Sequence, residues 1–498
     1  MRTAASTFGV VGTGVIGAGW AARALGRGLD VVAHDPAPGA ERRLRAAVDR
    51  AWPAVTRLGL YPGADPDRLR FVAAPEQVAG EADFVQEATP EVLDLKRAVL
   101  ATLDAAAPAG TVLASSTSGL RPSALQAGLT HPERVVVGHP FNPVYLLPLV
   151  EVVAGARTAP ETVDHARRVY DDLDMHPLVV RREVDGFLSD RLLEAVWREI
   201  LHLVAEGVAT TAELDDAITY GPGLRWAVMG TNLTYHLAGG DAGMRHMLDQ
   251  FGPALAWPWA RFAGPELTGE LVTAMVDGTS EQSGGRSVAE LEAQRDDALI
   301  AIMSALRSTG LGAGAVLARR EARTLEQGAP LRWTPGAQVP APLPLYSCRV
   351  APDWVDYNRH MTESAYLYAF GWASDALFRY IGIDESYRAA GNSFYTVESH
   401  LVYAREVASG EPLRFTTQLL SHDHKRMHIF HAMTHGRTGD LLCTNEQMLV
   451  HVDMAAGRSR PTLPGPLAAL DAVAQAHQAM ARPGAAVMHI GRSAWTSG

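Results

Sequence analysis

A histidine and a glutamate stand out in an otherwise nearly apolar stretch of the sequence. His139 and Glu151 both lie in GHPFNPVYLLPLVEVV, residues 138–153. Histidine suits a general base because its ordinary pKa is near neutrality. A buried carboxylate can fix the tautomer of the ring and stabilise its protonated form. The two residues indicate a pair that accepts the proton of an alcohol without a metal, although a lone histidine in such a stretch is also typical of a core residue.

Two neighbouring strands are needed to bring this pair together. RVVVGH ends at His139, and LVEVV contains Glu151. Through the first third of the chain, short apolar runs of this kind alternate with helical patterns. That alternation predicts an α/β domain with a doubly wound sheet over residues 1–184.

A glycine-rich turn follows the first predicted strand and opens a helix. The turn reads GTGVIG, and Asp35 ends the next predicted strand. Its glycines allow backbone N–H groups to approach a pyrophosphate at the N-terminus of the helix. Asp35 would bind a ribose diol and repel a 2′-phosphate, so NAD is favoured over NADP. The residues expected to contact NAD here are Gly12, Gly14, Val15, Ile16, Gly17 and Asp35.

The pattern changes twice further along the chain. Residues 185–327 are almost wholly helical, and FLSDRLLEAVWREILHLVAEG within them predicts a buried helix. A Pro-rich linker is expected at 328–344. One helix and four strand-like runs then predict an α+β domain at 345–460 with a mostly antiparallel sheet. We expect the tail, 461–498, to hold a short helix and otherwise to be disordered.

Charge and composition exclude several classes of partner. The net charge of -11 argues against nucleic acid and anionic membranes. We expect no signal peptide, and no apolar run is long enough to span a membrane. The two cysteines, Cys348 and Cys443, cannot form a disulfide framework and fit a reducing cytoplasm. The sequence therefore predicts a cytoplasmic protein that acts on small molecules.

The first two-thirds of the chain resembles the 3-hydroxyacyl-CoA dehydrogenase family. The resemblance rests on GTGVIG, QEATPEVLDLK, ASSTSGL, GHPFNPVYLLPLVEV and DGFLSDRLL, in that order. It implies a Rossmann domain followed by an all-α domain, with His139 as base and Glu151 as its partner. It also implies that Ser118 hydrogen-bonds the substrate oxygen. The further positions implied to contact NAD are Glu91, Lys96 and Asn142.

One residue departs from the family pattern. The family usually has asparagine where this chain has Asp190. A carboxylate there disfavours a negative charge and favours a cation nearby. The alternative is that Asp190 simply pairs with Arg191 or with another arginine.

The helical region is rich in aromatic residues. Trp226, Tyr235, Trp257 and Trp259 lie close together in a chain with 7% aromatic residues. Such residues are usually core, but aromatic rings also bind quaternary ammonium ions. The stretches GPGLRWAVMGTNLTYHLAGGDAGMRH and GFLSDRLLEAVWREILHLV resemble the L-carnitine dehydrogenase branch of the family, which implies L-carnitine as substrate. The expected pocket for its cation comprises Phe141, Tyr145, Asp190 and Trp226.

The C-terminal domain carries a second motif. VAPDWVDYNRHMTESAYLYAF, residues 350–370, resembles the D-x-x-G-H segment of hotdog-fold acyl-CoA thioesterases, although Arg359 stands where glycine would precede His360. The resemblance implies Asp356 as general base or nucleophile on a thioester. The fusion is similar to carnitine dehydrogenases joined to betainyl-CoA thioesterases, which implies betainyl-CoA as the second substrate. A hotdog module that serves only dimerisation is the alternative.

Two groups of side chains in this domain also suggest ligands. The possible cage residues for the betainyl cation are Trp354, Tyr357, Trp372 and Tyr395. Four histidines invite a metal site, but their alternation on strands favours a solvated sheet face, so we expect no metal: His422, His424, His428 and His431. Both domain types commonly associate, so a homodimer is expected.

Three functions are therefore compatible with the sequence. The favoured one is a bifunctional enzyme that oxidises L-carnitine with NAD and hydrolyses betainyl-CoA. The first alternative is a 3-hydroxyacyl-CoA dehydrogenase with an acyl-CoA thioesterase domain. The second is a non-catalytic protein that binds NAD as a sensor, which the presence of Ser118, His139 and Glu151 disfavours.

Overall fold

The computed structural model describes residues 5–61, 63–261, 263–307, 309–328, 332–351 and 354–486. The chain divides into two compact units, Met1–Arg320 and Glu321–Gly498. None of the helices described is long and apolar enough to cross a membrane.

The first unit begins with an eight-stranded sheet in the order β3-β2-β1-β4-β5-β6-β7-β8. All neighbouring pairs are parallel except β6 and β7, which are antiparallel. The doubly wound fold predicted from the alternating pattern is therefore confirmed, with one additional short strand, β3. The strands are β1 (Thr7–Val11), β2 (Asp30–His34), β3 (Leu69–Phe71), β4 (Phe84–Glu87), β5 (Val112–Ser115), β6 (Val135–Pro140), β7 (Leu149–Ala154) and β8 (His176–Val180).

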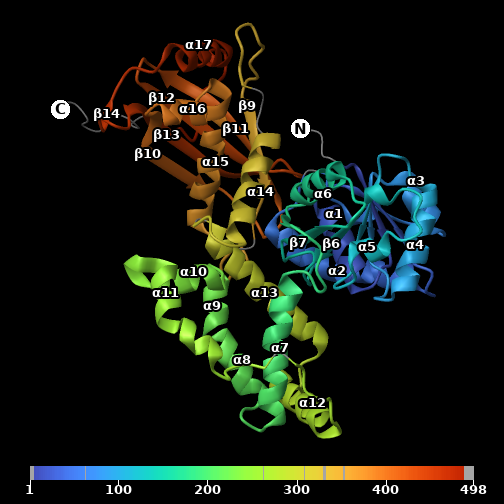
Figure 1. Cartoon of the computed structure of the whole chain (residues 1–498). Coiled ribbons are helices and arrows are strands. Elements are labelled where there is room, and N and C mark those ends of the chain that lie inside the picture. The colour runs from blue at the N-terminus through green and yellow to red at the C-terminus, as the bar shows by residue number, and fades with distance from the viewer. Residues whose placement is uncertain are drawn as a thin grey trace. The chain divides into compact units, whose positions relative to one another are not determined.

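Helices cover both faces of this sheet (Figure 1). The strands are apolar on both faces, so each face needs a layer of helices to exclude water. One layer consists of α1 (Val15–Gly26), α2 (Ala40–Leu58) and α6 (Pro160–Asp172). The other consists of α3 (Pro75–Glu81), α4 (Leu93–Ala106) and α5 (Pro122–Leu125). Short 3-10 helices lie at Pro66–Arg68 and Pro132–Arg134.

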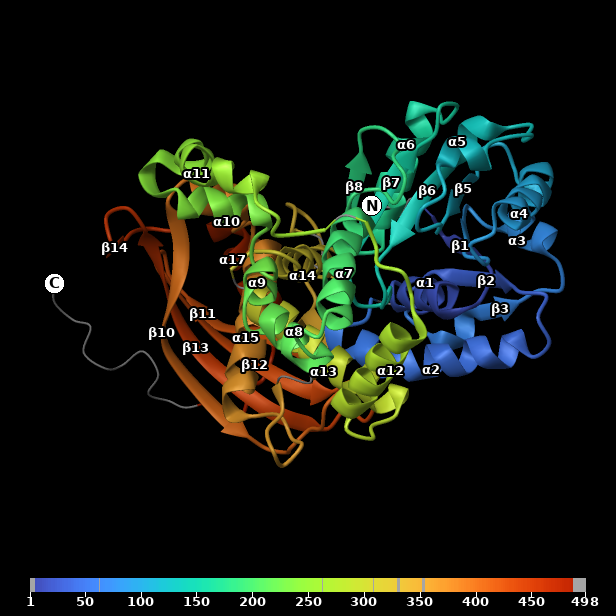
Figure 2. The same ribbon diagram turned by 60° about the horizontal axis from the view of Figure 1, so that its bottom comes forward.

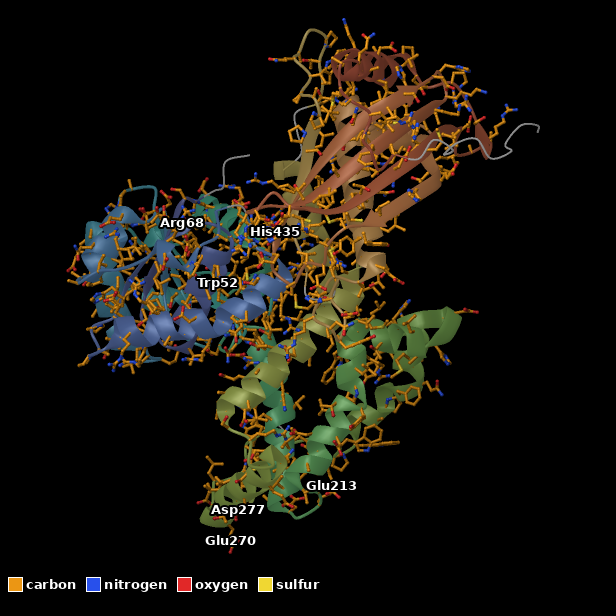
Figure 3. The ribbon with its side chains drawn as sticks, turned by 180° about the vertical axis from the view of Figure 1, so that it is seen from behind. Trp52, Arg68, Glu213, Glu270, Asp277 and His435 are labelled. Atoms are coloured by element: carbon orange, nitrogen blue, oxygen red, sulfur yellow. The ribbon has the colours of Figure 1, made fainter. Side chains whose placement is uncertain are left out.

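The rest of the first unit is helical, as predicted. Its helices are α7 (Ser189–Ala205), α8 (Thr211–Thr219), α9 (Pro222–Trp226), α10 (Thr231–Ala238), α11 (Gly243–Phe251), α12 (Gly269–Ser283), α13 (Val288–Arg307) and α14 (Gly314–Gly328), with 3-10 helices at Gly240–Ala242 and Gly252–Ala256. Exposed acidic side chains lie at the α8 and α12 end of this region, as Figure 3 shows for Glu213, Glu270 and Asp277.

The prediction that α7 is a buried helix is wrong for the single chain. Leu201 is its one residue classed as buried, whereas Leu192 is 73% exposed and Leu193 is 56% exposed. The apolar residues on several faces of α7 thus find too few neighbours within this unit to cover them.

The second unit is a hotdog domain, which confirms the predicted fold class. Its antiparallel sheet has the order β10-β13-β12-β11-β9, and β14 pairs with β13. The strands are β9 (Leu343–Arg349), β10 (Asn392–Tyr403), β11 (Pro412–His422), β12 (Arg426–His435), β13 (Leu441–Asp453) and β14 (Arg458–Ser459). Figure 2 shows the long strands side by side with α15 (Glu363–Ile381) across them, and α16 (Glu385–Ala389) follows α15 in the chain.

Both boundaries of this domain differ from the predicted ones. The predicted linker at 328–344 includes residues 329–331, which lie outside the described ranges, but Trp333 and Val339 pack against the core of the second unit. The predicted tail begins with α17 (Pro464–His477), whose Leu470 and Val473 are buried in the same core. Both segments belong to the domain because their apolar side chains pack in its core or against it. Residues 487–498 of the tail lie outside the described ranges.

Candidate active sites

The glycine-rich turn meets the requirements of a dinucleotide site. Gly12 has a positive φ of 89°, and a Cβ on Gly17 would lie 2.0 Å from the carbonyl oxygen of Gly12. A Cβ on Gly14, in contrast, would meet no atom within 4 Å. The backbone is therefore open at Gly14, where α1 begins and its first N–H groups point outward. Exposed Val15 and half-buried Ile16 follow in the first turn of α1. The residues present fit a pyrophosphate at this helix N-terminus.

Asp35 lies beside this turn, directly after β2. Its Oδ2 accepts hydrogen bonds from the Thr13 N–H at 2.8 Å and from the Thr13 hydroxyl at 3.1 Å. Its Oδ1 accepts one from the Ala37 N–H at 2.9 Å. Burial opposes ionisation of Asp35, but these hydrogen bonds lower the pKa of the carboxyl. The strand order reverses between β1 and β4, and in such sheets dinucleotides bind at this point. An ionised carboxylate at the end of the neighbouring strand β2 therefore suits a ribose diol.

His139 and Glu151 are directly opposite each other in the antiparallel pair of β6 and β7. His139 Nδ1 lies 3.0 Å from Glu151 Oε2, and both side chains are buried. Because an ionised carboxylate only accepts hydrogen bonds, Nδ1 must carry the proton, and Nε2 is left as the basic nitrogen. The strand register therefore prepares His139 to accept a proton at Nε2.

The start of α7 secures Glu151. The N–H groups of Leu188 and Ser189 donate to Glu151 Oε1 at 2.9 and 3.1 Å, and the Ser189 hydroxyl donates to Oε2. Burial opposes ionisation of Glu151, but the hydrogen bonds from His139, Ser189 and Leu188 lower its pKa. Glu151 thus remains a carboxylate that stabilises a protonated His139.

The same helix turn brings Asp190 to the other side of the imidazole. Asp190 Oδ2 lies 3.5 Å from His139 Nε2, and its side chain is 27% exposed. Burial is the largest cause of the raised pKa of Asp190, His139 opposes the rise and Glu151 adds to it. Arg191, the alternative partner, instead donates to the carbonyl oxygen of Asp185. A carboxylate therefore faces the basic nitrogen of the histidine.

Two phenylalanines enclose the imidazole. The Phe141 and Phe187 rings lie 5.9 and 5.6 Å from the His139 ring, centroid to centroid. Phe187 is fully buried in a turn where it has a φ of 47° and Gly186 has a φ of 68°. This backbone conformation is rare for a bulky residue and is typical of functional sites. Phe187 and Ser189 were not predicted as site residues, because only their contacts reveal their roles.

Ser118, Glu91 and Lys96 come together at the ends of β4 and β5. Ser118 is exposed, and both of its neighbours bind Glu91: the Thr117 hydroxyl donates to Oε1, and the Gly119 N–H does so at 3.3 Å. Lys96 is buried, 3.5 Å from Glu91 Oε2 and 3.0 Å from Glu87 Oε1. Lys96 therefore holds Glu91 and Glu87 rather than projecting into open space.

The other residues predicted to bind NAD or the substrate are more dispersed. Asn142 is exposed in the loop after β6. The Tyr145 hydroxyl donates to Asp296 of α13 at 2.7 Å, and burial together with this carboxylate raises the pKa of Tyr145. Trp226 is 43% exposed on α9, where its indole N–H donates to Thr231. No contact among the described residues joins Trp226 to His139.

Arg23 of α1 supports the loop that follows His139. Its guanidinium is buried and donates to the carbonyl oxygens of Val144 at 2.7 Å, Leu147 at 3.1 Å and Leu173 at 3.0 Å. Burial is the main reason that the pKa of Arg23 falls to about 9. No signal in the sequence indicates this role, since arginine is ordinarily exposed.

The second site lies at a small hairpin that precedes α15. Asp356 is half-buried and accepts hydrogen bonds from the Asn358 N–H at 2.8 Å and from its amide nitrogen at 3.2 Å. His360 lies at the other side of this turn, with Nδ1 3.3 Å from Glu406 Oε2. Thr362 then occupies the N-cap position of α15. A carboxylate thus stands next to a helix N-terminus, whose N–H groups can polarise a carbonyl.

Arg359 occupies the glycine position of the thioesterase motif and has the backbone conformation of a glycine, with a φ of 64°. Replacing Arg359 with glycine is expected to stabilise the hotdog domain by about 0.5–1 kcal/mol. The left-handed conformation is strained for arginine and free of strain for glycine, and the strain that is relieved exceeds the larger entropy that glycine loses on folding. Thermal unfolding would measure the gain. Arg359→Ala removes the side chain but keeps the strain, so an equal gain in that variant would contradict the backbone explanation.

Two of the four histidines, His428 and His431, are buried and do not lie on a solvated sheet face, which corrects the prediction for these two. His431 is fully buried, and burial lowers its pKa to about 3. Its ring nitrogens bind Thr417 Oγ1 at 2.8 Å and Ser374 Oγ at 3.0 Å. His428 is buried against Glu446. Among the described residues no three side chains of His, Cys, Asp or Glu are grouped to hold a metal ion.

Comparison with known sequences finds three family models that match this chain. Residues 7–184 match the NAD binding domain of 3-hydroxyacyl-CoA dehydrogenase, and 186–286 match the C-terminal domain of the same enzyme. Residues 350–476 match the thioesterase-like superfamily. NAD is therefore the cofactor of the first unit, whose glycine turn and Asp35 would hold it.

Several relatives match at high identity. L-carnitine dehydrogenase/betainyl-CoA thioesterase from Rhizobium meliloti is 44% identical and covers 97% of this chain and 98% of its own. L-carnitine dehydrogenase from Pseudomonas aeruginosa is 62% identical over 62% of this chain and 96% of its own. A solved NAD+-dependent dismutase, the 5-dehydrogenase of 5-formyl-3-hydroxy-2-methylpyridine 4-carboxylic acid, is 31% identical with a TM-score of 0.53, over 60% of this chain and 98% of that chain. The chain belongs to the family of fused L-carnitine dehydrogenase/betainyl-CoA thioesterases.

Proposed function

We propose that the first unit oxidises L-carnitine to 3-dehydrocarnitine with NAD and that the second hydrolyses betainyl-CoA. The observation that carries the first assignment is Asp190 Oδ2, 3.5 Å from the basic nitrogen of His139. In L-carnitine a single methylene separates the hydroxyl-bearing carbon from the trimethylammonium group. A hydroxyl bound to His139 Nε2 therefore places the cation beside the Asp190 carboxylate.

The proton chemistry follows from the two contacts of the imidazole. When bound, NAD accepts the hydride from the hydroxyl-bearing carbon. His139 Nε2 takes the hydroxyl proton, and Glu151 stabilises the resulting imidazolium through Nδ1. Phe141 and Phe187 exclude water around the ring, which strengthens both interactions. Exposed Ser118, held by its neighbours on Glu91, is suited to bind the substrate oxygen.

The direct test compares L-carnitine, D-carnitine and 3-hydroxybutyryl-CoA as reductants of NAD, with NADH absorbance as the readout. Turnover of L-carnitine alone supports the proposal. Turnover of the CoA ester alone would identify a 3-hydroxyacyl-CoA dehydrogenase and overturn the role of Asp190. No turnover of any of the three would indicate an NAD-binding protein of another function.

Asp190→Asn should weaken binding of the cation while keeping the catalytic pair. We expect the KM for L-carnitine to rise about tenfold, because a partly buried carboxylate next to a cation contributes on the order of 1–4 kcal/mol. Glu194→Gln, an exposed neighbour one turn along α7, is the matched control and should leave KM unchanged. Equal effects of both substitutions would mean that Asp190 acts only through the general charge of the helix.

The same variant also tests how the KM for L-carnitine depends on pH. Asp190 is charged above its pKa and neutral below it, and that pKa is raised. In the wild type, the KM for L-carnitine should therefore increase as the pH falls through a value above the ordinary range for aspartate. Asp190→Asn should lack this increase.

In the second unit, Asp356 is the proposed general base or nucleophile. Its carboxylate lies at the hairpin tip just before α15, so a thioester carbonyl polarised by the N-terminus of α15 is within its reach. The alternative of a module that serves only dimerisation predicts no hydrolysis of any CoA ester.

We further propose that the protein forms a homodimer in the cytoplasm. Large apolar side chains remain exposed on α7, among them Leu192, Leu193 and Trp197. An apolar surface of this kind usually marks an interface. The free cysteines, Cys348 and Cys443, support a reducing compartment.

Trp197→Glu is expected to shift the protein from dimer to monomer, because burying a carboxylate in an apolar interface is strongly unfavourable. Sedimentation velocity would measure the state. Arg198→Glu, the next residue on the same helix, is the control for added charge and should remain dimeric. A wild-type protein that sediments as a monomer would contradict the proposal.

A further inference from the structure

Three aromatic rings of the second unit form a continuous series. The Trp354 and Tyr368 rings are 5.8 Å apart at 80°, and the Tyr368 and Trp372 rings are 5.9 Å apart at 90°. Tyr368 and Trp372 are separated by one turn of α15, which places them on the same side of the helix. Trp354 comes from the hairpin that precedes it.

Only one ring of this series packs on the hydrophobic core, since Trp354 lies against the cluster that contains Tyr366 and Phe370. On the inner side of α15, Tyr366 is 3% exposed and Phe370 is fully buried. Tyr368 is 43% exposed, and Trp354 and Trp372 are half-buried. A helix in a hotdog domain needs apolar residues only where it faces the sheet, so core packing does not account for the outward rings of Tyr368 and Trp372.

The series begins beside the proposed catalytic carboxylate. Trp354 is two residues before Asp356, and its carbonyl oxygen accepts a hydrogen bond from the Thr362 N–H at 2.8 Å. Val355 pairs with Met361 in the same hairpin. Trp354 is thus fixed at the base of the turn that carries Asp356, next to the first residue of α15. The side chain of Tyr368 tilts toward this end of the helix, as helical side chains do.

We propose that Trp354 and Tyr368 form the binding site for the trimethylammonium group of the betainyl thioester, with Trp372 holding Tyr368 from the far side. This inference rests on the proposed hydrolysis of betainyl-CoA. The two rings meet edge to face at 80°, so a cation bound in the angle between them would contact the open part of both faces, and aromatic faces are the groups by which proteins recognise quaternary ammonium ions. In betaine one methylene joins the ammonium nitrogen to the carbonyl carbon, so the cation must bind next to the group that attacks the carbonyl.

The geometry also separates these residues from the other predicted cage residues. Tyr357 is 93% exposed and Tyr395 is 51% exposed, and no ring contact is seen for either within the described residues. Tyr368 was absent from the prediction because its role depends on the ring of Trp354, which the sequence places fourteen residues away.

The test compares betainyl-CoA with 3,3-dimethylbutyryl-CoA, its neutral isostere, in which carbon replaces the ammonium nitrogen. Tyr368→Leu in the full chain is expected to raise the KM for betainyl-CoA about tenfold, since a partly desolvated cation–π contact contributes on the order of 1–2 kcal/mol. The KM for the neutral ester should be unchanged. Tyr368→Phe keeps the ring and should behave as wild type, as should Leu367→Ala, an exposed neighbour on α15.

Equal changes for both esters in Tyr368→Leu, or no change for either, would overturn the cation site. If the wild type hydrolyses neither ester, the proposed hydrolysis fails, and the site is tested by saturation-transfer NMR with tetramethylammonium. The dehydrogenase unit is the same in the wild type and in Tyr368→Leu, so any tetramethylammonium bound there contributes equally to both signals. A weaker methyl signal in the variant therefore supports a cation site on Tyr368. Identical signals would refute it.

Discussion

Replacing His139 with glutamine is expected to lower the turnover of L-carnitine about 10³-fold, the usual contribution of a positioned general base. Glutamine fills similar space and can still hydrogen-bond Glu151 from its amide group, but it cannot accept a proton from the substrate. The glycine turn and Asp35 do not contact His139 in the structure, so the Kd of NAD should stay near the wild-type value. Steady-state rates and titration of NAD binding would measure the two effects separately.

His176→Gln is the matched control for this substitution. His176 is an exposed residue at the start of β8, the strand next to Glu151's strand β7, so it tests the loss of a histidine in the same sheet. Turnover should be unaffected. If His139→Gln lowered NAD affinity and turnover together, His139 would be a structural residue of the sheet rather than a base.

Replacing Asp356 with asparagine should abolish thioester hydrolysis, with a loss of about 10³-fold or more, while the dehydrogenase activity remains. Asparagine can still accept the hydrogen bond that Asp356 takes from the Asn358 N–H, so the hairpin should persist. The charge and the basicity are lost, and both a general base and a nucleophile need them. Hydrolysis of betainyl-CoA and reduction of NAD by L-carnitine, measured on the same preparation, give the result.

Asp423→Asn provides the comparison within the hotdog domain. Asp423 also closes a turn, in which it accepts hydrogen bonds from the N–H groups of Lys425 and Arg426. Hydrolysis should therefore survive its replacement. Persistent hydrolysis in Asp356→Asn would show that the thioesterase site lies elsewhere, and loss of both activities would point to unfolding of the chain.

Where local signals coincide, the sequence was a good guide. The glycine turn, a strand before it and Asp35 after the next strand together predicted the NAD site, because each has a fixed place in a βαβ unit. His139 and Glu151 could be placed on neighbouring strands, and the register then set them opposite each other. Four strands of the antiparallel hotdog sheet, β10 to β13, were also predictable, since they are long and separated by evident turns. The edge strand β9 was missed because it directly follows the Pro-rich segment, and β14 was missed because it has only two residues.

The remaining features depend on contacts between distant segments. Whether α7 is buried depends on what surrounds it, which its apolar pattern does not specify. The position of Asp190 opposite His139 Nε2 follows from the turn around Phe187, whose positive φ no propensity would predict. His431 lies on a strand of alternating pattern, yet α15 covers it through Ser374. Trp333 was assigned to a linker because of the prolines around it, although its ring packs in the core.

Arg23 donates hydrogen bonds to four carbonyl oxygens, and these bonds have a consequence for how α1 and the loop after His139 are held together. The oxygens belong to Val144, Leu147, Leu173 and Asp174. The helix that carries Arg23 begins at the glycine turn, so α1 would hold the dinucleotide at its N-terminus and contacts the loop after His139 along its side. Local opening of that loop requires the guanidinium to lose its partners in a buried setting. The loop after His139 is therefore held in place by the same helix whose N-terminus would receive the pyrophosphate.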